Sequence, residues 1–363
     1  MTNNDTPPVA AKSVAPLALW LVLLAAAGAF ALTMGTRQTM GLFLSALNTS
    51  TALGIGSISL AFAFGQLWWG LTQPFAGAVA DRIGTGRVIL LGVALVALGT
   101  FITPYMTTTA GLIFAIGVLA AGGAGMAGPS VLMAATARLV PASKRGLASG
   151  IVNAGGSFGQ FVMAPIAISL TAAVGWASAM QWLGVLVLLA LPAVWVLKGN
   201  SNALAAQAAA ASGQKALTAR EAIAQALATP SYRYLAVGFL VCGFHVAFLA
   251  THLPGVIAAC GLAPEVGGWA LAVIGLFNIV GSLAMGWAVG RWRMKSLLTL
   301  VYATRAVAVL LFVLAPKTEA VVLVFAAVMG LSFLSTVPPT AGLVAKFFGT
   351  GNMAMLFGVV MVS

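Results

Sequence analysis

Ten long apolar runs, separated by short polar turns, follow one another along this chain of 363 residues. A hydrocarbon layer of about 30 Å takes roughly 20 helical residues to cross, and most of the runs reach that length. A backbone in hydrocarbon must satisfy its own hydrogen bonds, and the short alternating strands of a membrane barrel are absent from the sequence, so helices are predicted. The predicted spans are residues 17–43, 53–80, 88–102, 110–137, 146–173, 177–197, 234–258, 268–290, 297–314 and 320–345.

The composition and the placement of charge fit an all-α, multi-pass membrane protein. Hydrophobic residues make up 61% of the chain and charged residues only 6%, whereas about 25% of the residues in soluble domains are charged. Of the 17 Lys and Arg residues, Arg37 and Arg305 lie inside predicted spans and Lys317 lies on one side; all the others gather on the opposite side when the loops are alternated. The positive-inside rule makes that side, with the N-terminus, cytoplasmic. The net charge of +12 is thus explained by orientation in a lipid bilayer, and no nucleic-acid partner is predicted.

An alanine-rich polar stretch after the sixth span divides the chain. Within it, Thr218 and Glu221 have the spacing of a capping box, which predicts a short surface helix. The predicted parts are a cytoplasmic tail (1–16), an N-terminal six-helix half (17–197), a cytoplasmic linker (198–231) and a C-terminal half (232–363). The last apolar run, from residue 352, is too short to span, so we expect a second half truncated within its eleventh helix.

The two halves carry an internal repeat. Residues 77–87 read GAVADRIGTGR and residues 286–295 read GWAVGRWRMK, so that Gly77 matches Gly286 and Arg82 matches Arg291 at an offset of 209. Gly150 and Gly358 match at an offset of 208. Such self-similarity predicts two pseudo-symmetric halves of six helices each.

The turn after the second span resembles the signature of the major facilitator superfamily. That signature is G-x-x-x-D-R-x-G, here Gly77, Asp81, Arg82 and Gly84. The segments PASKRGLASG (141–150), MGLF (40–43) and WGLTQPFAG (69–77) are similar to the bacterial monocarboxylate-transporter-like branch, which includes oxalate/formate antiporters. The resemblance covers nearly the whole chain. It implies a secondary transporter of the bacterial inner membrane that works by alternating access between two six-helix halves.

The same resemblance implies a set of gating residues at the cytoplasmic turns. They are Gly77, Asp81, Arg82, Gly84 and Arg87, with Arg291 in the second half. Asp81 is expected to be exposed at its turn and to bond helix ends and Arg82 in one gate state. The chain departs from the superfamily pattern in two places. The pattern has basic residues directly after its last glycine, whereas here Thr85 and Gly86 come between that glycine and Arg87. In the second half, Gly290 stands where the pattern would place an aspartate.

Arg37 is the leading candidate for substrate binding because it lies deep in the outer half of the first span. The superfamily's central site is lined mainly by the first, fourth, seventh and tenth helices. A guanidinium that keeps its charge can hold both oxygens of a carboxylate. The alternative is a structural arginine that reaches the outer surface or bonds a helix end.

His245 follows Arg37 by 208 residues, so the repeat places it at the matching position of the seventh helix, facing Arg37. A histidine there can titrate near neutral pH and couple protons to anion movement, and His252 lies one heptad further on. The alternative for either residue is a neutral imidazole hydrogen-bonded across a helix interface.

Other polar side chains inside spans complete the candidates. Gln38, Asn278 and Ser335 are added to the substrate-binding set, and each has the alternative of an interhelical hydrogen bond. Arg305 is expected to be a structural buried charge that bonds carbonyls or helix ends. The glycines of 122–128 with Pro129, and the pair Pro338 and Pro339, predict hinge-like segments in the fourth and tenth spans.

A transporter is favoured over the other function classes. An enzyme would need a nucleophile, a metal cluster or a carboxylate pair inside the spans, and the acidic residues lie at turns, in the linker or at helix ends. No metal, no cofactor and no enzyme activity are therefore predicted; a channel or receptor has no positive support. The predicted substrate is a small organic anion, a mono- or dicarboxylate, carried by a monomer with proton coupling or by exchange. The alternative is an efflux carrier for apolar or amphipathic molecules, lined by Phe62, Phe64, Trp68, Trp69, Phe244 and Phe248.

Overall fold

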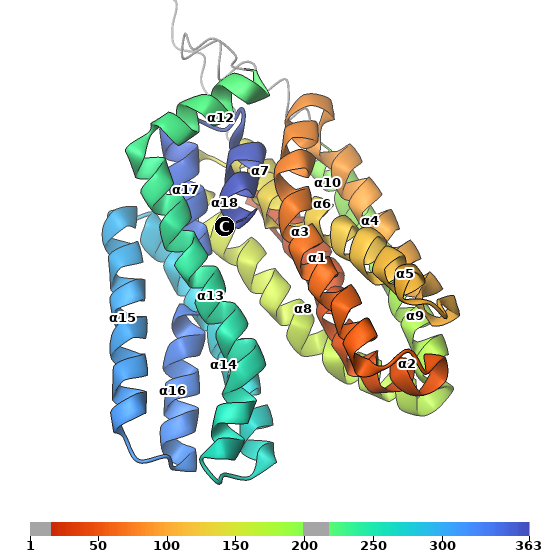
Figure 1. Cartoon of the computed structure of the whole chain (residues 1–363). Coiled ribbons are helices and arrows are strands. Elements are labelled where there is room, and N and C mark those ends of the chain that lie inside the picture. The colour runs from red at the N-terminus through yellow and green to blue at the C-terminus, as the bar shows by residue number, and fades with distance from the viewer. Residues whose placement is uncertain (1–15, 199–217, 363) are drawn as a thin grey trace, which may run out of the picture.

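The computed structural model describes residues 16–198 and 218–362, and all regular elements in these ranges are helices (Figure 1). The first half contains α1 (Pro16–Thr39), η1 (Met40–Phe43), α2 (Leu44–Thr51), α3 (Ile55–Ile83), α4 (Thr85–Ile102), η2 (Thr103–Tyr105), α5 (Thr109–Leu112), η3 (Ile113–Ala121), α6 (Gly122–Met126), α7 (Pro129–Leu139), η4 (Ala142–Lys144), α8 (Arg145–Val174), α9 (Trp176–Val187), η5 (Leu188–Ala190) and α10 (Leu191–Leu197). The rest contains α12 (Ala219–Ala228), α13 (Pro230–Ala259), α14 (Pro264–Val289), α15 (Met294–Leu314), α16 (Glu319–Ser332), α17 (Val337–Phe348) and α18 (Met353–Val362).

The helices agree with the predicted spans. Among the described residues, eight helical segments are long and apolar enough to cross a membrane. The second and seventh predicted spans fall on α3 and α13, which are 29 and 30 residues long. The all-α polytopic fold predicted from the sequence is therefore confirmed. Residues 1–15 of the predicted tail and residues 199–217 of the predicted linker lie outside the described part of the chain, so the proposed division into tail, halves and linker stays a prediction.

The described end of the linker forms the predicted surface helix. The Thr218 hydroxyl accepts a hydrogen bond from the Glu221 backbone N–H at 3.3 Å, and the Glu221 carboxylate accepts one from the Thr218 backbone N–H at 2.8 Å. The pKa of the Glu221 carboxyl is lowered, because hydrogen bonds to it from the Thr218 backbone N–H and from the Thr218 side chain favour its charged form. Ala222 and Ala226 are buried where α12 meets α13 and α18.

The fourth and tenth spans are both broken just before their prolines. In the fourth, α6 ends at Met126 and α7 starts at Pro129; in the tenth, α16 ends at Ser332 and Pro338 stands in the first turn of α17. Proline fits the first turn of a helix because it has no N–H to leave unbonded there. The predicted hinge-like segments are therefore real interruptions, and they lie at places related by the repeat.

The repeated glycines mark the two crossings at which the halves touch most closely. A Cβ added at Gly77 of α3 would lie 2.4 Å from the carbonyl carbon of Ala354 in α18. A Cβ added at Gly286 of α14 would lie 2.7 Å from the Cα of Gly150 in α8. Only glycine permits backbones to approach so closely, so the repeat carries matching contacts.

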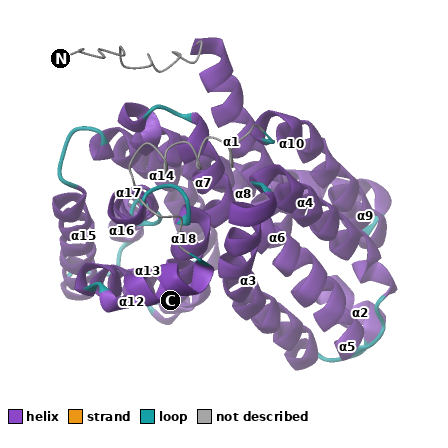
Figure 2. Ribbon diagram, turned by 90° about the horizontal axis from the view of Figure 1, so that it is seen from above, coloured by secondary structure: helices purple, strands orange, loops and turns teal. Residues whose placement is uncertain are grey.

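The two halves meet at one end of the bundle. We call this the basic end, because its turns and helix ends carry Arg87, Lys144, Arg291 and Lys346. Figure 1 shows the halves close together at this end and splayed apart toward the other. Seen from the basic end, α18 lies between the two groups of helices (Figure 2), and it packs on α3 and α7 of the first half.

We predict that Gly77→Ala destabilises the α3–α18 crossing. The added methyl group has no room, and overpacking of this kind costs about 1–3 kcal/mol. Gly70→Ala is the matched control on the same helix, since its Cβ would lie 3.8 Å from the nearest atom, the Met361 carbonyl oxygen. Melting temperatures in detergent should fall for Gly77→Ala and stay unchanged for Gly70→Ala; equal values for the two variants would contradict the close packing.

Candidate functional site

A buried ion pair closes the basic end. Arg138, in the last turn of α7, donates to the Asp81 carboxylate near the end of α3, and their side chains are only 1% and 5% exposed. Arg138 also donates to the carbonyl oxygens of Thr350 (3.1 Å) and Gly351 (3.0 Å), which precede α18. The Met355 backbone N–H donates to Asp81 at 3.2 Å. The pair therefore ties both sides of the α3–α18 contact together.

This arrangement corrects the expectation for Asp81. The sequence placed its carboxylate in an exposed turn, whereas the side chain is only 5% exposed and is paired with Arg138. The reason is that α3 continues to Ile83, so that Asp81 is still helical and points at α7 and α18. Asp81 does bond a helix end, because its carboxylate accepts a hydrogen bond from the Met355 backbone N–H in the first turn of α18. The bond to Arg82, expected in one of the two gate states, stays a prediction.

The remaining gate candidates surround this pair. Gly84 separates α3 from α4 with φ 101° and ψ 142°, a conformation that strongly favours glycine. Arg87 is exposed in the first turn of α4. In the second half, the guanidinium of Arg291 lies over the ring of Trp287 at 4.0 Å, beside Gly290, which replaces the acid. A gating role for Arg87 and Arg291 stays a prediction.

Arg37 lies in the last turn of α1, half-buried, and reaches α3. Its guanidinium donates to the Gln66 side-chain oxygen and lies 4.9 Å from the centre of the Trp69 ring. It also approaches the Met34 sulfur at 4.0 Å. Among the described residues, no carboxylate forms an ion pair with it, and the neighbouring Gln38 is exposed. The site thus holds a partly exposed, uncompensated positive charge with an amide and an indole face beside it.

His245 lies on α13, one turn beyond Cys242. Its Nδ1 is buried and has no hydrogen-bond partner among the described residues. Its ring lies 6.2 Å from that of the adjacent Phe244. The side chain of His252 lies outside the described residues. The predicted role of both histidines therefore stays a prediction.

Asn278 takes part in a buried polar network that joins the halves. It donates to the Ser157 hydroxyl of α8 at 2.7 Å and accepts from the Leu334 backbone N–H at 3.1 Å. Asn153 of α8 donates to the Ser282 hydroxyl of α14 at 2.7 Å and to the Leu334 carbonyl at 3.2 Å. These contacts are the interhelical hydrogen bonds that the sequence left open as the alternative for Asn278.

The break in the tenth span is held by side chains from neighbouring helices. Arg305 of α15 is 1% exposed, and it donates to the backbone carbonyls of Ser332 and Phe333, the latter at 2.6 Å. Cys242 and Thr336 lie within hydrogen-bonding distance, 3.0 Å. The Ser335 hydroxyl donates to the Leu331 carbonyl one turn earlier. Arg305 thus occupies carbonyls at a helix interruption, the kind of contact expected of a structural charge.

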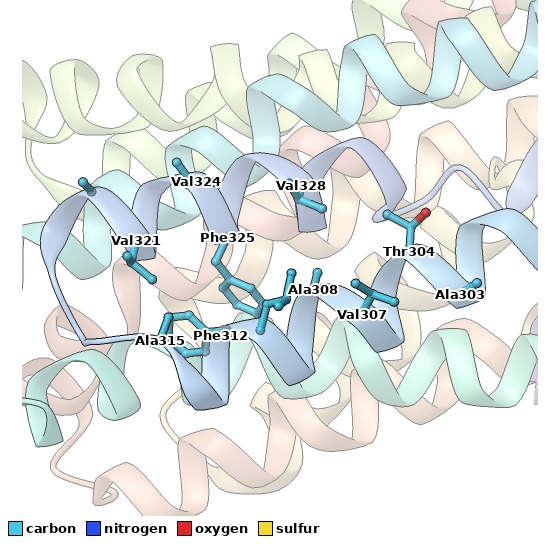
Figure 3. Close-up of a pocket in the computed structure, with 12 residues that line it drawn as sticks. Ala303, Thr304, Val307, Ala308, Phe312, Ala315, Val321, Val324, Phe325 and Val328 are labelled. Atoms are coloured by element: carbon cyan, nitrogen blue, oxygen red, sulfur yellow. The ribbon is translucent and has the colours of Figure 1, made fainter.

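The structure contains two large cavities, one between the halves and one on the outer face of the second half. One, of about 600 Å³, separates α8 from α14 beyond the Asn278–Ser157 contact and includes Ser157, Gln160 and Gly275. The other, of about 570 Å³, lies between α15 and α16 (Figure 3). Thr304 is the one polar side chain among the residues that line it. Such a lining does not suit an anion.

Sequence reasoning missed the contacts between distant residues more than the residues themselves. Arg138 was recognised only as a basic residue on the cytoplasmic side, and its location directly after the fourth span was the available signal. Asn153, a polar side chain inside a span, favoured an interhelical hydrogen bond but not a particular partner, and Ser282 gave no signal beyond its polarity. Within the described residues, no group of three or more His, Cys, Asp or Glu side chains is arranged to hold a metal ion.

Sequence comparisons give consistent relatives. A family model described as Major Facilitator Superfamily matches residues 14–363. The chain is 24% identical over 330 residues to an uncharacterized MFS-type transporter, YhjX of Escherichia coli (strain K12), which covers 90% of this chain and 80% of that protein. It is 27% identical over 168 residues to monocarboxylate transporter 14 of Mus musculus, over 44% of this chain and 31% of the mouse protein.

Solved structures with the same fold include two sugar transporters. The proton:xylose symporter XylE, bound to 6-bromo-6-deoxy-D-glucose, superposes with a TM-score of 0.71 and 14% identity, covering 95% of this chain and 86% of that one. The Escherichia coli fucose:proton symporter FucP gives 0.66 and 14%, covering 96% and 88%. At this level of identity the similarity concerns the fold alone.

We predict that Asp81→Asn opens the basic end without unfolding the protein. It leaves the Arg138 charge buried without its counter-charge, and breaking a buried pair costs about 3–5 kcal/mol. Hydrogen–deuterium exchange of the backbone amides of residues 350–356 should accelerate at least about tenfold, since each 1.4 kcal/mol is a factor of ten. Arg293→Gln, which alters an exposed charge in another turn of the same end, is the control. Unchanged exchange in Asp81→Asn would show that the pair does not hold this end closed.

Proposed function

This chain belongs to the Major Facilitator Superfamily, and from that premise we propose that it is a secondary active transporter that moves a small organic anion, a mono- or dicarboxylate, by alternating access. It is a multi-pass integral membrane protein, and transporters of its family bind small-molecule substrates. The proposal concerns the substrate class, the coupling and the residues that carry them.

The uncompensated charge of Arg37 is the observation that carries the proposal. A cation inside a membrane bundle is costly unless it faces a cavity or meets a partner. Arg37 has Gln66 and Trp69 beside it and no carboxylate paired with it among the described residues. A substrate carboxylate would supply the missing charge, bound by two parallel hydrogen bonds. The name of the mouse relative, a monocarboxylate transporter, supports the same class.

The closed basic end supports one direction of access. If the positive-inside rule holds, the basic end faces the cytoplasm of a bacterial cell, with the N-terminus on the same side. The splayed end then faces outward, and the crevice between α8 and α14 opens on that side. Alternation would require Asp81 and Arg138 to separate while the splayed end closes.

Proton coupling or exchange completes the proposal, with His245 as the coupling residue and His252 behind it. An imidazole whose Nδ1 is buried without a partner has a free position for a proton or for the anion itself. The two structural neighbours, XylE and FucP, are proton symporters. We further propose that the transporter works as a monomer in the inner membrane.

The alternative is an efflux carrier for apolar or amphipathic molecules. The apolar cavity between α15 and α16 favours it, although that cavity lies on the outer face of the second half. Phe64 and Trp68, two aromatic residues expected to line such a pathway, instead pack on Gly117 and Gly122 of the fourth span. The anion carrier is therefore preferred.

We predict a graded response to replacement of Arg37. Arg37→Lys keeps the charge but loses the planar two-point contact, so carboxylate binding should weaken by about 1–3 kcal/mol. Arg37→Ala should abolish anion transport. Uptake of radiolabelled oxalate and lactate into proteoliposomes is the measurement, with Arg293→Gln as the control. Carboxylate uptake retained by Arg37→Ala would place the site elsewhere and favour the efflux carrier.

We predict that His245→Gln separates exchange from proton coupling. Glutamine can form a hydrogen bond but does not titrate, so anion exchange should continue while net uptake loses its dependence on pH. Uptake measured from about pH 5 to pH 8 spans the titration of histidine. A pH profile identical to that of the unaltered protein would assign the coupling to another group.

A further inference from the structure

Gln73 of α3 is a buried amide without a partner. The residue is 0% exposed, and neither its side-chain nitrogen nor its side-chain oxygen forms a hydrogen bond with any described residue. The indole N–H of Trp69, one turn earlier on the same helix, is also buried and unbonded in the described part of the chain. Leaving such groups unpaired in a membrane bundle costs free energy. The pair therefore calls for a function in another state of the protein.

These two residues continue the stripe that starts at the Arg37 site. Gln66, Trp69 and Gln73 are spaced by three and four residues, so they lie on one face of α3. Gln66 and Trp69 both contact Arg37. Gln73 lies beyond them toward the basic end, about 10 Å from Gln66 at the helical rise. The stripe thus leads from the guanidinium into the closed part of the bundle.

The internal repeat provides a comparison for the unpaired side chain of Gln73. At the offset of 209, Trp69 corresponds to Asn278 and Gln73 to Ser282. Asn278 and Ser282 are satisfied by Ser157 and Asn153 of the opposite half.

Among the described residues, the corresponding crossing of α3 with α18 offers Gln73 no such partner. There α18 presents Gly358, whose added Cβ would lie 2.7 Å from the backbone of Gln73. A glycine brings no hydrogen-bonding side chain, so the opposite half cannot pair the amide as it does at the α8–α14 crossing. One crossing uses its polar groups to join the halves, and the other leaves them unused.

We propose that the Gln73 amide and the Trp69 indole N–H form a second binding position for the transported carboxylate, occupied after it leaves Arg37 and the basic end opens. This inference rests on the proposed function. Both groups donate hydrogen bonds and neither carries charge, so they bind the anion more weakly than a guanidinium and favour its release. The hydroxyls of Ser130 and Thr340, also buried without a partner, stand in the first turns of α7 and α17, beside the same buried core.

The first test separates binding from turnover. Gln73→Leu removes the amide at similar size, Gln73→Asn shortens but keeps it, and Gln181→Leu is the matched control on α9. Equilibrium binding and proteoliposome uptake are measured with radiolabelled oxalate and lactate. Gln73→Leu should bind within about twofold of the unaltered protein but turn over about tenfold more slowly, the scale of one hydrogen bond to a charged group. Gln73→Asn should recover part of the rate. Unchanged turnover, or a loss confined to binding, would overturn the inference.

The second test needs no substrate. In a Cys242→Ser, Cys260→Ser background, Gln73→Cys should react with a membrane-impermeant thiol reagent applied at the basic end, and more so when Asp81→Asn is added. Phe75→Cys on the lipid-facing side of α3, where the native side chain is 72% exposed, should stay unreacted. Lack of reaction at Gln73→Cys in both backgrounds would refute its place on the path, whatever Arg37 binds. Failure of oxalate and lactate to bind the unaltered protein would instead refute the proposed function, and with it the second position for a carboxylate.

Discussion

A polar group buried among membrane helices must find its partner within the protein, because hydrocarbon supplies none. Three sets of buried polar side chains meet most of this constraint here, with one guanidinium nitrogen each of Arg138 and Arg305 left unbonded among the described residues. Arg138 and Asp81 satisfy each other and the start of α18; Arg305 occupies the carbonyls at the tenth-span break; Asn153 bonds Ser282 between the halves. The positions of α18, α17 and α14 follow from these contacts. Groups that fail to find a partner are then informative, because packing alone does not account for them.

Features set by neighbouring residues were predictable from the sequence. The apolar runs defined the spans, since length and hydropathy are local properties. Pro129 and Pro338 identified the broken helices because proline has no N–H to donate to the carbonyl one turn earlier. The breaks themselves begin a few residues before these prolines. The capping box at Thr218 followed from spacing alone. The repeat added a long-range expectation, and the contact of Gly77 with α18 and of Gly286 with α8 shows why glycine recurs at those positions.

Pairings between distant residues were not predictable. Asp81 and Arg138 are 57 residues apart, and Asn153 and Ser282 are 129 apart. Asp81 and Arg138 each directly follow a predicted span on the same side of the membrane, and the chain has only 5 acidic residues. These facts reduced the number of possible ion pairs but did not identify the partner of Asp81. Arg138 follows another predicted span, and the sequence alone does not show how the ends of two spans are turned toward each other. The candidate site shows the same limit: Arg37 was found from its depth, whereas its contacts with Gln66 and Trp69 depend on how α1 packs against α3.

The two crossings share their glycines but differ in how they are held. At α8–α14, amide and hydroxyl side chains join the halves, and such bonds contribute about 0.6 kcal/mol each in membrane proteins. At α3–α18, the contact is apolar along most of its length, and the Asp81–Arg138 ion pair lies at its basic end. Water can hydrate that ion pair as soon as the helix ends part, whereas Asn278 and Ser282 lie away from the basic end and are only 2% and 0% exposed. The α8–α14 crossing is therefore suited to persist as a pivot, and the α3–α18 crossing to separate, which exposes Gln73 and Trp69 first.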